Sequence, residues 1–341
     1  MGWESIRGQD AALDLLRRDL SSGQVAGAYL FYGPDGVGKA SAARLFARAL
    51  QCAGDAPPCG GCAACEKVLA GVHPDVVSVR PEAGSRSIRV ESIREEVIWR
   101  AHQRPNEGMR QIFIIEDAHL LTRVGQNALL KTLEEPSAAT ILILVTPNLH
   151  TLLPTIISRC RRLRFQALAR VDLAAILEER LGADGVDVDK LVSLSMGRLG
   201  VAMTSDVEAL SERRDEAMRF LEELSAPAGK ADEVTLITLA SERAGSGASG
   251  RNETILFLEM LRGLLRDILI TQEAPEAIEL WHADIRAALA AMGERWGSAG
   301  LTRALERVGE AMRDVDGGNT NPSLTLETLV YSLRETVPAG V

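Results

Sequence analysis

Residues 29–41 read YLFYGPDGVGKAS, an apolar run that leads directly into a glycine-rich turn. Tyr29–Tyr32 predicts a buried strand, and residues 40–50 predict a helix whose apolar side carries Ala43, Leu45, Phe46 and Leu50. Between them, four residues separate Gly33 from Gly38, and Lys39 follows. Glycines let backbone N–H groups converge on an anion, and a helix N-terminus adds positive potential. The spacing predicts a phosphate loop in which Lys39 reaches the outer phosphates of a nucleotide.

The loop departs from the full pattern one residue after the lysine. Ala40 stands where Ser or Thr normally ligates Mg²⁺, and the adjacent Ser41 points about 100° away along the helix. We therefore expect a degenerate site that binds ATP or ADP weakly or not at all. The alternative is a glycine turn that only packs strand against helix. The candidate nucleotide contacts are Gly33, Gly36, Gly38, Lys39, Ala40 and Ser41.

Two further apolar runs, 112–115 and 141–145, predict strands, and the sheet should end near 163–165. Continuous apolar strands between helices are typical of a parallel sheet covered on both faces. The run 112–115 ends in Glu116 and Asp117, a position where nucleotide hydrolases hold Mg²⁺ and polarise water. Here the usual Asp-Glu order is reversed. Asp117 is one methylene shorter than the usual Glu, and a displacement near 1 Å can cost about 10²-fold in rate. The alternative is a solvated strand end.

Four cysteines lie close together in the sequence: Cys52, Cys59, Cys62 and Cys65. In a reducing cytoplasm this spacing favours a metal site over disulfides, and four thiolates close a tetrahedral Zn²⁺ shell. We expect a structural zinc; the alternative is free or buried thiols. The intervening residues carry no Lys, Arg or aromatic side chain before Cys65, which disfavours a nucleic-acid-binding knuckle. Cys160 stands apart and should be small and buried.

The composition bounds the remaining possibilities. The 341 residues predict two or three domains, and the net charge of −9 disfavours a general polyanion binder. The N-terminus lacks a basic segment followed by an apolar one, and no apolar run is long enough to span a membrane, so we expect a cytoplasmic protein.

The strand signal fades after Phe165. Residues 171–180 and 187–196 predict short helices ended by Gly182 and Gly197. The remainder predicts helices at 206–225, 231–244, 251–272, 275–292 and 298–314, with a flexible loop at 245–250. We expect an α/β domain over 1–166 with the cysteine module near 50–68, a helical lid over 167–205, and a helical domain over 206–341.

Several motifs together resemble the clamp-loader subunits of bacterial DNA polymerase III, in the AAA+ family. They are the phosphate loop, the cysteine insertion after its helix, His73-Pro74-Asp75, the run NALLKTLEEP at 127–136, Ser158-Arg159-Cys160, and the run NTNPSLTLE at 319–327. The resemblance is strong over the first 205 residues and weak beyond them. It implies an AAA+ P-loop-type domain with a parallel sheet, a small helical lid, and an all-α collar for oligomerisation.

The resemblance also assigns a role to Arg159. It implies an arginine finger, whose planar cation completes a neighbouring subunit's ATP site in trans. The alternative is one surface arginine among several, with Arg161, Arg162 and Arg164 nearby. The run 127–135 predicts a helix with leucines on its core side and with Lys131, Glu134 and Glu135 exposed, which Pro136 stops.

Three departures fall on the chain's own nucleotide site: Ala40, the reversed pair Glu116-Asp117, and Gly200, where the family's motor subunits carry a sensing arginine. Arg198, two positions away, can partly substitute. The resemblance therefore implies a rigid stator with little or no ATPase activity. Its partners would be motor and delta-type subunits in a hetero-oligomeric ring, with the sliding clamp and primed DNA reached through the complex and no polymerase activity of its own. The alternatives are an active ATPase motor subunit and a zinc-dependent nucleic-acid binder acting alone.

Overall fold

A computed structural model describes residues 2–82, 85, 87–182, 187–225, 236, 238, 247–316 and 320–337. The chain divides into two compact units. The N-terminal unit holds Met1–Asp172 with Arg198–Gly200, and the C-terminal unit holds Leu173–Gly197 with Val201–Val341. The predicted helix at 231–244, apart from residues 236 and 238, lies outside the described residues, as do Gly245, Ser246 and Asn319.

The N-terminal unit is built on a five-stranded parallel sheet with the strand order β2-β3-β4-β1-β5. The strands are β1 (Ala28–Tyr32), β2 (Val76–Val79), β3 (Gln111–Ile115), β4 (Thr140–Thr146) and β5 (Arg161–Arg164). Four of them lie where the apolar runs predict them. The prediction lacked β2, because its four residues include Ser78 and it lies at the edge of the sheet.

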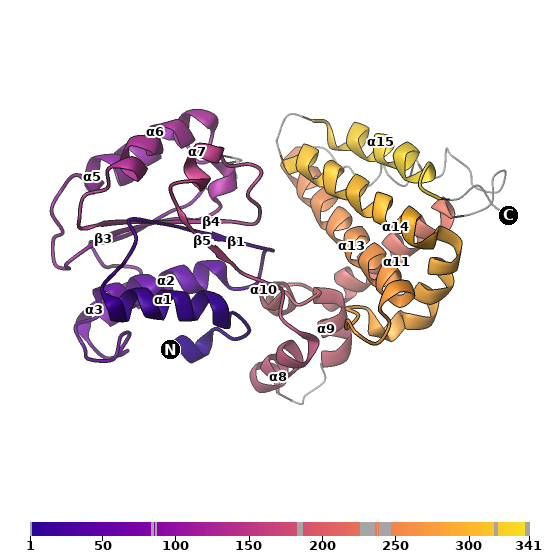
Figure 1. The fold of residues 1–341 in the computed structure, drawn as a ribbon, viewed down its shortest axis with the longest axis horizontal. Helices are drawn as coiled ribbons and strands as arrows, with labels where there is room; N and C mark the ends of the chain where they lie inside the picture. Colours follow the sequence, from indigo (N-terminus) through magenta and orange to yellow (C-terminus); the bar gives the residue numbers. More distant parts are fainter. Residues whose placement is uncertain are drawn as a thin grey trace. The chain divides into compact units, whose positions relative to one another are not determined.

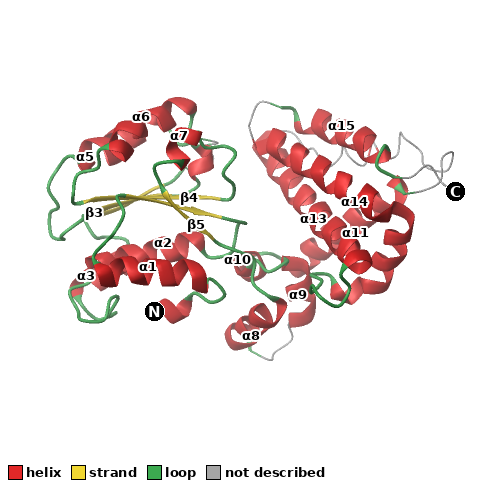
Figure 2. Ribbon diagram, in the orientation of Figure 1, coloured by secondary structure: helices red, strands yellow, loops and turns green. Residues whose placement is uncertain are grey.

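Helices cover both faces of this sheet (Figures 1 and 2). On one face lie α1 (Asp10–Ser22), α2 (Lys39–Gln51) and α3 (Ala63–Leu69). On the other lie α5 (Trp99–Ala101), α6 (Arg123–Glu134) and α7 (Pro154–Ile157). The π-helical η2 (Ile93–Ile98) follows α4 (Val90–Ser92), and short 3₁₀ turns are η1 (Trp3–Ser5) and η3 (Ala118–Leu120).

Alternation along β1 separates two hydrophobic cores. Tyr29 and Phe31 pack with Phe46 of α2, whereas Leu30 joins the core that contains Leu129 of α6. Side chains on a strand alternate between faces, so this one strand contributes to both layers. The parallel sheet covered on both faces is therefore confirmed.

Three short helices follow the sheet in the chain: α8 (Arg170–Leu181), α9 (Val188–Ser195) and α10 (Leu199–Thr204). The two glycine stops are confirmed, since Gly182 and Gly197 adopt φ angles of 72° and 77°. Such left-handed conformations suit glycine at a helix C-terminus. The sequence reasoning did not foresee α10.

All the regular secondary structure described in the C-terminal unit is helical (Figure 2). Its main helices are α11 (Val207–Leu224), α13 (Gly247–Glu273), α14 (Arg286–Asp316) and α15 (Pro322–Arg334). They enclose one hydrophobic core around Trp296, Leu261 and Leu264. No helix in the described part of the chain combines the length and apolarity that a membrane span needs.

Two helix predictions in this unit need correction. Residues 247–250 are helical, although the sequence suggested a loop there. The predicted helix at 275–292 starts only at Arg286, after the short turn η4 (Ala283–Ile285). The buried carboxylate of Asp267 accepts the His282 backbone N–H at 2.8 Å, which favours a turn at this point. The predicted break before residue 298 is a kink at Gly297, where φ is 63°.

Candidate functional site

The glycine-rich loop that the sequence predicts to bind phosphate lies between the end of β1 and the start of α2. Gly33, Gly36 and Gly38 adopt φ angles of 143°, 77° and 98°, which residues with a Cβ rarely reach. At Gly33 an added Cβ would lie 2.0 Å from the carbonyl oxygen of Phe165. The glycines are thus needed both for the turn and for its close packing against the chain that follows β5.

Lys39 is turned into its own loop. Its Nζ donates to the carbonyl oxygens of Gly33 and Pro34, each at 2.6 Å, and to Asp35 Oδ1 at 3.1 Å. Only 5% of its surface is exposed. A buried ammonium needs such acceptors, and here the loop itself supplies them.

Two other groups fix this loop from outside. The Gln9 side chain donates to Gln166 O at 2.7 Å and accepts from Gln166 N at 3.0 Å, while it also reaches Val37 O at 3.4 Å. Gly200 N donates to Gly36 O at 2.7 Å, and an added Cβ at Gly200 would lie 2.8 Å from Gly36 Cα. Gly200 is therefore in direct backbone contact with the loop.

The acidic end of β3 is engaged by two arginines. Arg44 Nη2 of α2 lies 2.8 Å and 2.9 Å from the two Glu116 carboxylate oxygens, and Arg80 Nη2 lies 2.9 Å from Oε1. Parallel pairing of Val79 with Ile115 places Arg80 beside Glu116. Glu116 is thus neutralised by side chains of its own unit.

Asp117 follows in a left-handed conformation with φ 52°. Burial by surrounding protein raises the pKa of its carboxyl; His119 opposes this, and Asp35 and Glu116 add to it. Asp35, Glu116 and Asp117 therefore influence one another electrostatically, while Arg44 and Arg80 pair with Glu116. Of the other predicted contacts, Ala40 is half-buried with no ligand oxygen on its side chain, and Ser41 is exposed.

The four cysteines meet in space. Their Sγ atoms all lie within 4.8 Å of one another, so they could hold a metal ion. Tetrahedral Zn–S bonds of about 2.3 Å would place sulfur atoms about 3.8 Å apart. The donor set and its spread therefore fit a closed thiolate shell.

Backbone groups and neighbouring side chains organise this cluster. Hydrogen bonding from the Ala53 backbone lowers the pKa of Cys62 to about 6, while burial raises the pKa of Cys65 to about 12. Trp3 Nε1 donates to Pro57 O at 2.9 Å and thereby ties the N-terminal segment to the cysteine loop. Cys160 is separate and buried, and burial raises its pKa to about 12.

Arg159 lies just after α7, with 34% of its side chain exposed. Its Nη1 donates to Thr155 O at 2.9 Å, and its Nη2 lies 2.6 Å from Glu134 Oε1. Buried Gln126 of α6 holds the chain before α7, since it donates to Thr151 O at 3.0 Å and accepts from Leu153 N at 2.8 Å. The arginine is thus presented by a segment braced against α6.

The motif His73-Pro74-Asp75 has a structural role at the sheet edge. Asp75, only 2% exposed, accepts backbone N–H groups from Asn106, Glu107 and Gly108 at 2.7–2.8 Å, and the Asn106 side chain at 3.0 Å. This single carboxylate therefore fixes the turn that leads into β3.

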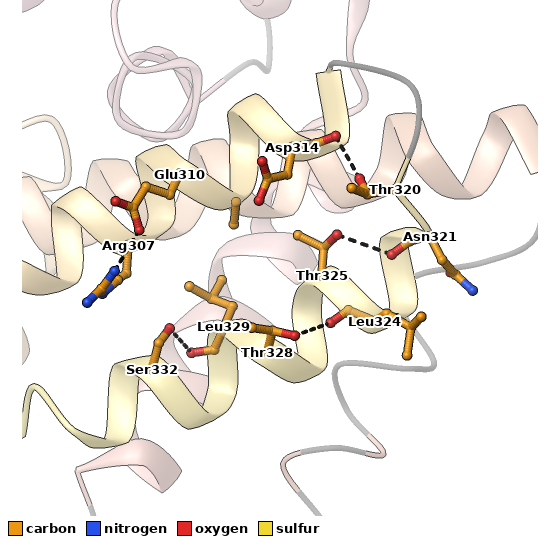
Figure 3. A pocket seen from close by; sticks show the side chains of 11 residues that line it. Arg307, Glu310, Asp314, Thr320, Asn321, Leu324, Thr325, Thr328, Leu329 and Ser332 are labelled. Carbon is orange, nitrogen blue, oxygen red and sulfur yellow. Dashed lines mark hydrogen bonds and ion pairs between the residues drawn. The ribbon is translucent and has the colours of Figure 1, made fainter.

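A groove of about 470 Å³ lies between α14 and α15 (Figure 3). On α15, Thr325 donates to Asn321 O at 3.1 Å and Thr328 to Leu324 O at 2.8 Å, whereas Thr320 donates to Asp314 O of α14 at 2.6 Å. Arg307 and Glu310 pair along one side at 2.9 Å. The groove is lined by Arg307, Glu310, Ala311, Asp314, Thr320, Asn321, Leu324, Thr325, Thr328, Leu329 and Ser332.

The sequence did not predict the side chains that pair with Lys39 and Glu116. Asp35 is four residues before Lys39. This spacing brings the two side chains into contact only because the glycine-rich loop turns back on itself. The contact of Arg80 with Glu116 depends on the pairing of β2 with β3, and β2 was not predicted. Arg44 lies on α2, and its contact with Glu116 joins residues that are far apart in the chain.

Known proteins match this chain in two segments. Sequence profiles described as DNA polymerase III, delta subunit, and its C-terminal part match residues 8–169 and 248–335. DNA polymerase III subunit delta' of Bacillus subtilis is 35% identical, covering 61% of this chain and 60% of its own length. The delta' subunit of Pseudomonas aeruginosa is 36% identical over 59% of this chain and 62% of its own.

The gamma/tau subunit of Mycobacterium tuberculosis is 32% identical, over 96% of this chain and 60% of its own length. Among these relatives the chain spans about 60% of the matched protein. A gamma-subunit-related structure from Thermotoga maritima aligns over 95% of this chain and 99% of its own, with 21% identity and a TM-score of 0.40, too low to support an inference. Two profile matches and two delta' relatives place the chain in the clamp-loader subunit family of bacterial DNA polymerase III, as a member of the delta-prime type.

Proposed function

We propose that this chain is a stator of a DNA polymerase III clamp loader, in the cytoplasm, and that it donates Arg159 to the ATP site of a neighbouring subunit. The observation that supports this most is the contrast between its two cationic sites. Lys39 is buried among acceptors of its own loop, whereas Arg159 lies at the surface beyond α7.

The geometry of Arg159 suits a contribution in trans. A guanidinium can meet two phosphate oxygens at once, a fork that Lys cannot reproduce. The side chain already contacts one carboxylate, Glu134. An anion of a neighbouring subunit would take the place of this surface partner, whose exchange costs little because exposed ion pairs contribute only about 0–1 kcal/mol.

The chain's own loop is proposed to turn over ATP negligibly. Ala40 supplies no Mg²⁺ ligand, and Glu116 is engaged by Arg44 and Arg80. A motor subunit needs both a metal-binding hydroxyl and an acid free to act on the metal or water. This observation disfavours the alternative of an active motor.

Zinc is proposed as the occupant of Cys52, Cys59, Cys62 and Cys65. Four thiolates complete a tetrahedral shell with no position for a substrate, so the ion would stabilise the loop between α2 and α3 and supply no catalysis. The helical C-terminal unit is proposed to join the collar of the complex. Exposed Leu324 and Tyr331 on α15 offer apolar surface for a neighbouring subunit.

The experiment that tests the stator proposal compares reconstituted clamp-loader complexes containing wild-type chain, Arg159→Ala or Arg159→Lys. The reading is ATPase activity stimulated by clamp and primed DNA, together with clamp loading. A finger contributes about 10³–10⁵-fold at the site it serves. One site should therefore be nearly silent, the total rate should fall in part, and Arg159→Lys should restore little.

The matched control is Arg162→Ala, which removes another exposed arginine from the neighbouring strand β5. Incorporation of each variant is verified by gel filtration of the complex. Wild-type rates for a fully incorporated Arg159→Ala complex would refute the finger. Rates lowered equally by Arg162→Ala would indicate a general charge effect.

A further inference from the structure

The ion pair between Lys39 and Asp35 keeps the lysine turned into its own loop. Lys39 Nζ has two neutral acceptors, the carbonyl oxygens of Gly33 and Pro34, and one charged acceptor, Asp35 Oδ1. The side chain of Lys39 is 5% exposed, whereas that of Asp35 is 61% exposed. The carboxylate therefore stands at the solvent side of the buried ammonium.

This placement puts Asp35 in competition with a nucleotide. The outer phosphates of a bound nucleotide would need Lys39 as their cation. To reach it they would have to approach a carboxylate of the same sign and replace it as the charged partner. Repulsion and competition both act against binding, because the carboxylate of Asp35 would face the phosphates until it is displaced from Lys39.

A second contact acts in the same direction on the same loop. Gly200 N donates to the carbonyl oxygen of Gly36, the residue after Asp35, at 2.7 Å. This close approach leaves no space for a side chain at position 200. The Gly36 carbonyl is thus held by a hydrogen bond while the Asp35 side chain contacts Lys39. Both contacts stabilise the loop conformation in which the lysine faces inward.

We propose that Asp35 is an intramolecular counter-ion that occupies Lys39 in place of a nucleotide phosphate and thereby inhibits nucleotide binding at this loop. The inference deepens the proposed function and rests on it in treating this loop as a nucleotide site without turnover. It makes the low affinity a consequence of one removable side chain as well as of the missing Mg²⁺ ligand.

The test measures binding of ADP and of ATP with Mg²⁺ to the purified full chain by titration calorimetry. Asp35→Asn keeps the shape of the side chain and removes its charge. Only the Asp35 end of the pair is exposed, so loss of the pair and of the repulsion should tighten binding by about 3- to 10-fold. Lys39→Met added to Asp35→Asn should abolish the gain.

The chain offers a closely matched control. Asp14 pairs with Arg17 at 3.1 Å and is 60% exposed, so Asp14→Asn makes the same charge change at the same exposure outside the loop. It should leave binding unchanged. Circular dichroism verifies folding of each variant, and Asp35→Ser serves as a second uncharged variant if Asp35→Asn is not folded.

Unchanged binding in folded Asp35→Asn or Asp35→Ser chains would overturn the inference, as would an equal gain in Asp14→Asn or a gain that survives Lys39→Met. Such a failure leaves the trans role of Arg159 untouched, because that role is read from the assembled complex. Conversely, wild-type ATPase with Arg159→Ala would sink the stator proposal and leave a measured gain in Asp35→Asn standing.

Discussion

Replacing Asp75 by Asn tests how the edge of the sheet is held. The carboxylate receives four N–H groups, and Glu107 N and Gly108 N both point to Oδ2 at 2.8 Å. An amide nitrogen in that position cannot accept, so two backbone donors lose their partner. At about 1–3 kcal/mol for each unsatisfied buried group, Asp75→Asn should lower the free energy of unfolding of this unit by roughly 2–6 kcal/mol. At about 2–4 °C per kcal/mol for a unit of this size, that corresponds to a fall in Tm of about 4–24 °C.

The assay follows thermal and urea unfolding of the full chain, with hydrogen exchange at residues 104–110 as the local reading. Asp14→Asn serves as the control, because it neutralises an exposed Asp that pairs only within α1. A loss below about 0.5 kcal/mol in Asp75→Asn, or an equal loss in the control, would refute the reasoning.

The pH dependence of this difference has a definite sign. Burial acts to raise the pKa of Asp75, but hydrogen bonds from the Asn106, Gly108 and Glu107 backbones outweigh it and leave the pKa below its usual 3.8. The charged carboxylate therefore contributes stability above the unfolded-state pKa, and this contribution is lost as the pH falls through the folded-state pKa. The stability gap between wild type and Asp75→Asn should be full near neutral pH and shrink below about pH 4.

Two further predictions concern the metal and the lid contact. Elemental analysis of protein prepared without chelator should find about one Zn²⁺ per chain, and metal-free protein would contradict the zinc proposal. Cys62→Ala should speed hydrogen exchange of the backbone amides at 50–68 more than elsewhere. Gly200→Ala places a Cβ 2.8 Å from Gly36 Cα and should lower the free energy of unfolding, measured in urea, by about 1–3 kcal/mol. The control is Gly61→Ala, whose added Cβ meets open space and should lower it less. Equal losses in the two variants would count against the contact.

Local sequence signals were sufficient for the central strands and for the loop. The runs 29–32, 112–115 and 141–145 are apolar throughout and fall in the buried strands β1, β3 and β4. The cysteine spacing likewise predicted a cluster, because turns within a short segment can bring thiols together without distant contacts. These features depend on residues close in the chain.

Features that depend on tertiary pairing were not predictable in the same way. Arg80 reaches Glu116 only because β2 pairs with β3, and a short edge strand with a central serine gives a weak signal. The turn before Arg286 depends on the buried contact of Asp267 with His282, whereas the local composition favours helix. The contact of Gly200 with Gly36 joins residues far apart in the chain. The sequence alone therefore shows a glycine at position 200 but does not show that it contacts the loop.

The brace beneath Arg159 has an entropic consequence. An arginine side chain free in solvent loses about 2 kcal/mol of rotamer freedom when it is fixed. Here Gln126 fixes the preceding chain, and Thr155 O and Glu134 already restrict the guanidinium. Much of this entropy is therefore lost when the chain folds. If Arg159 acts in trans as proposed, less entropy would be lost when a partner's anion binds, because the direction of the guanidinium would be largely set before assembly.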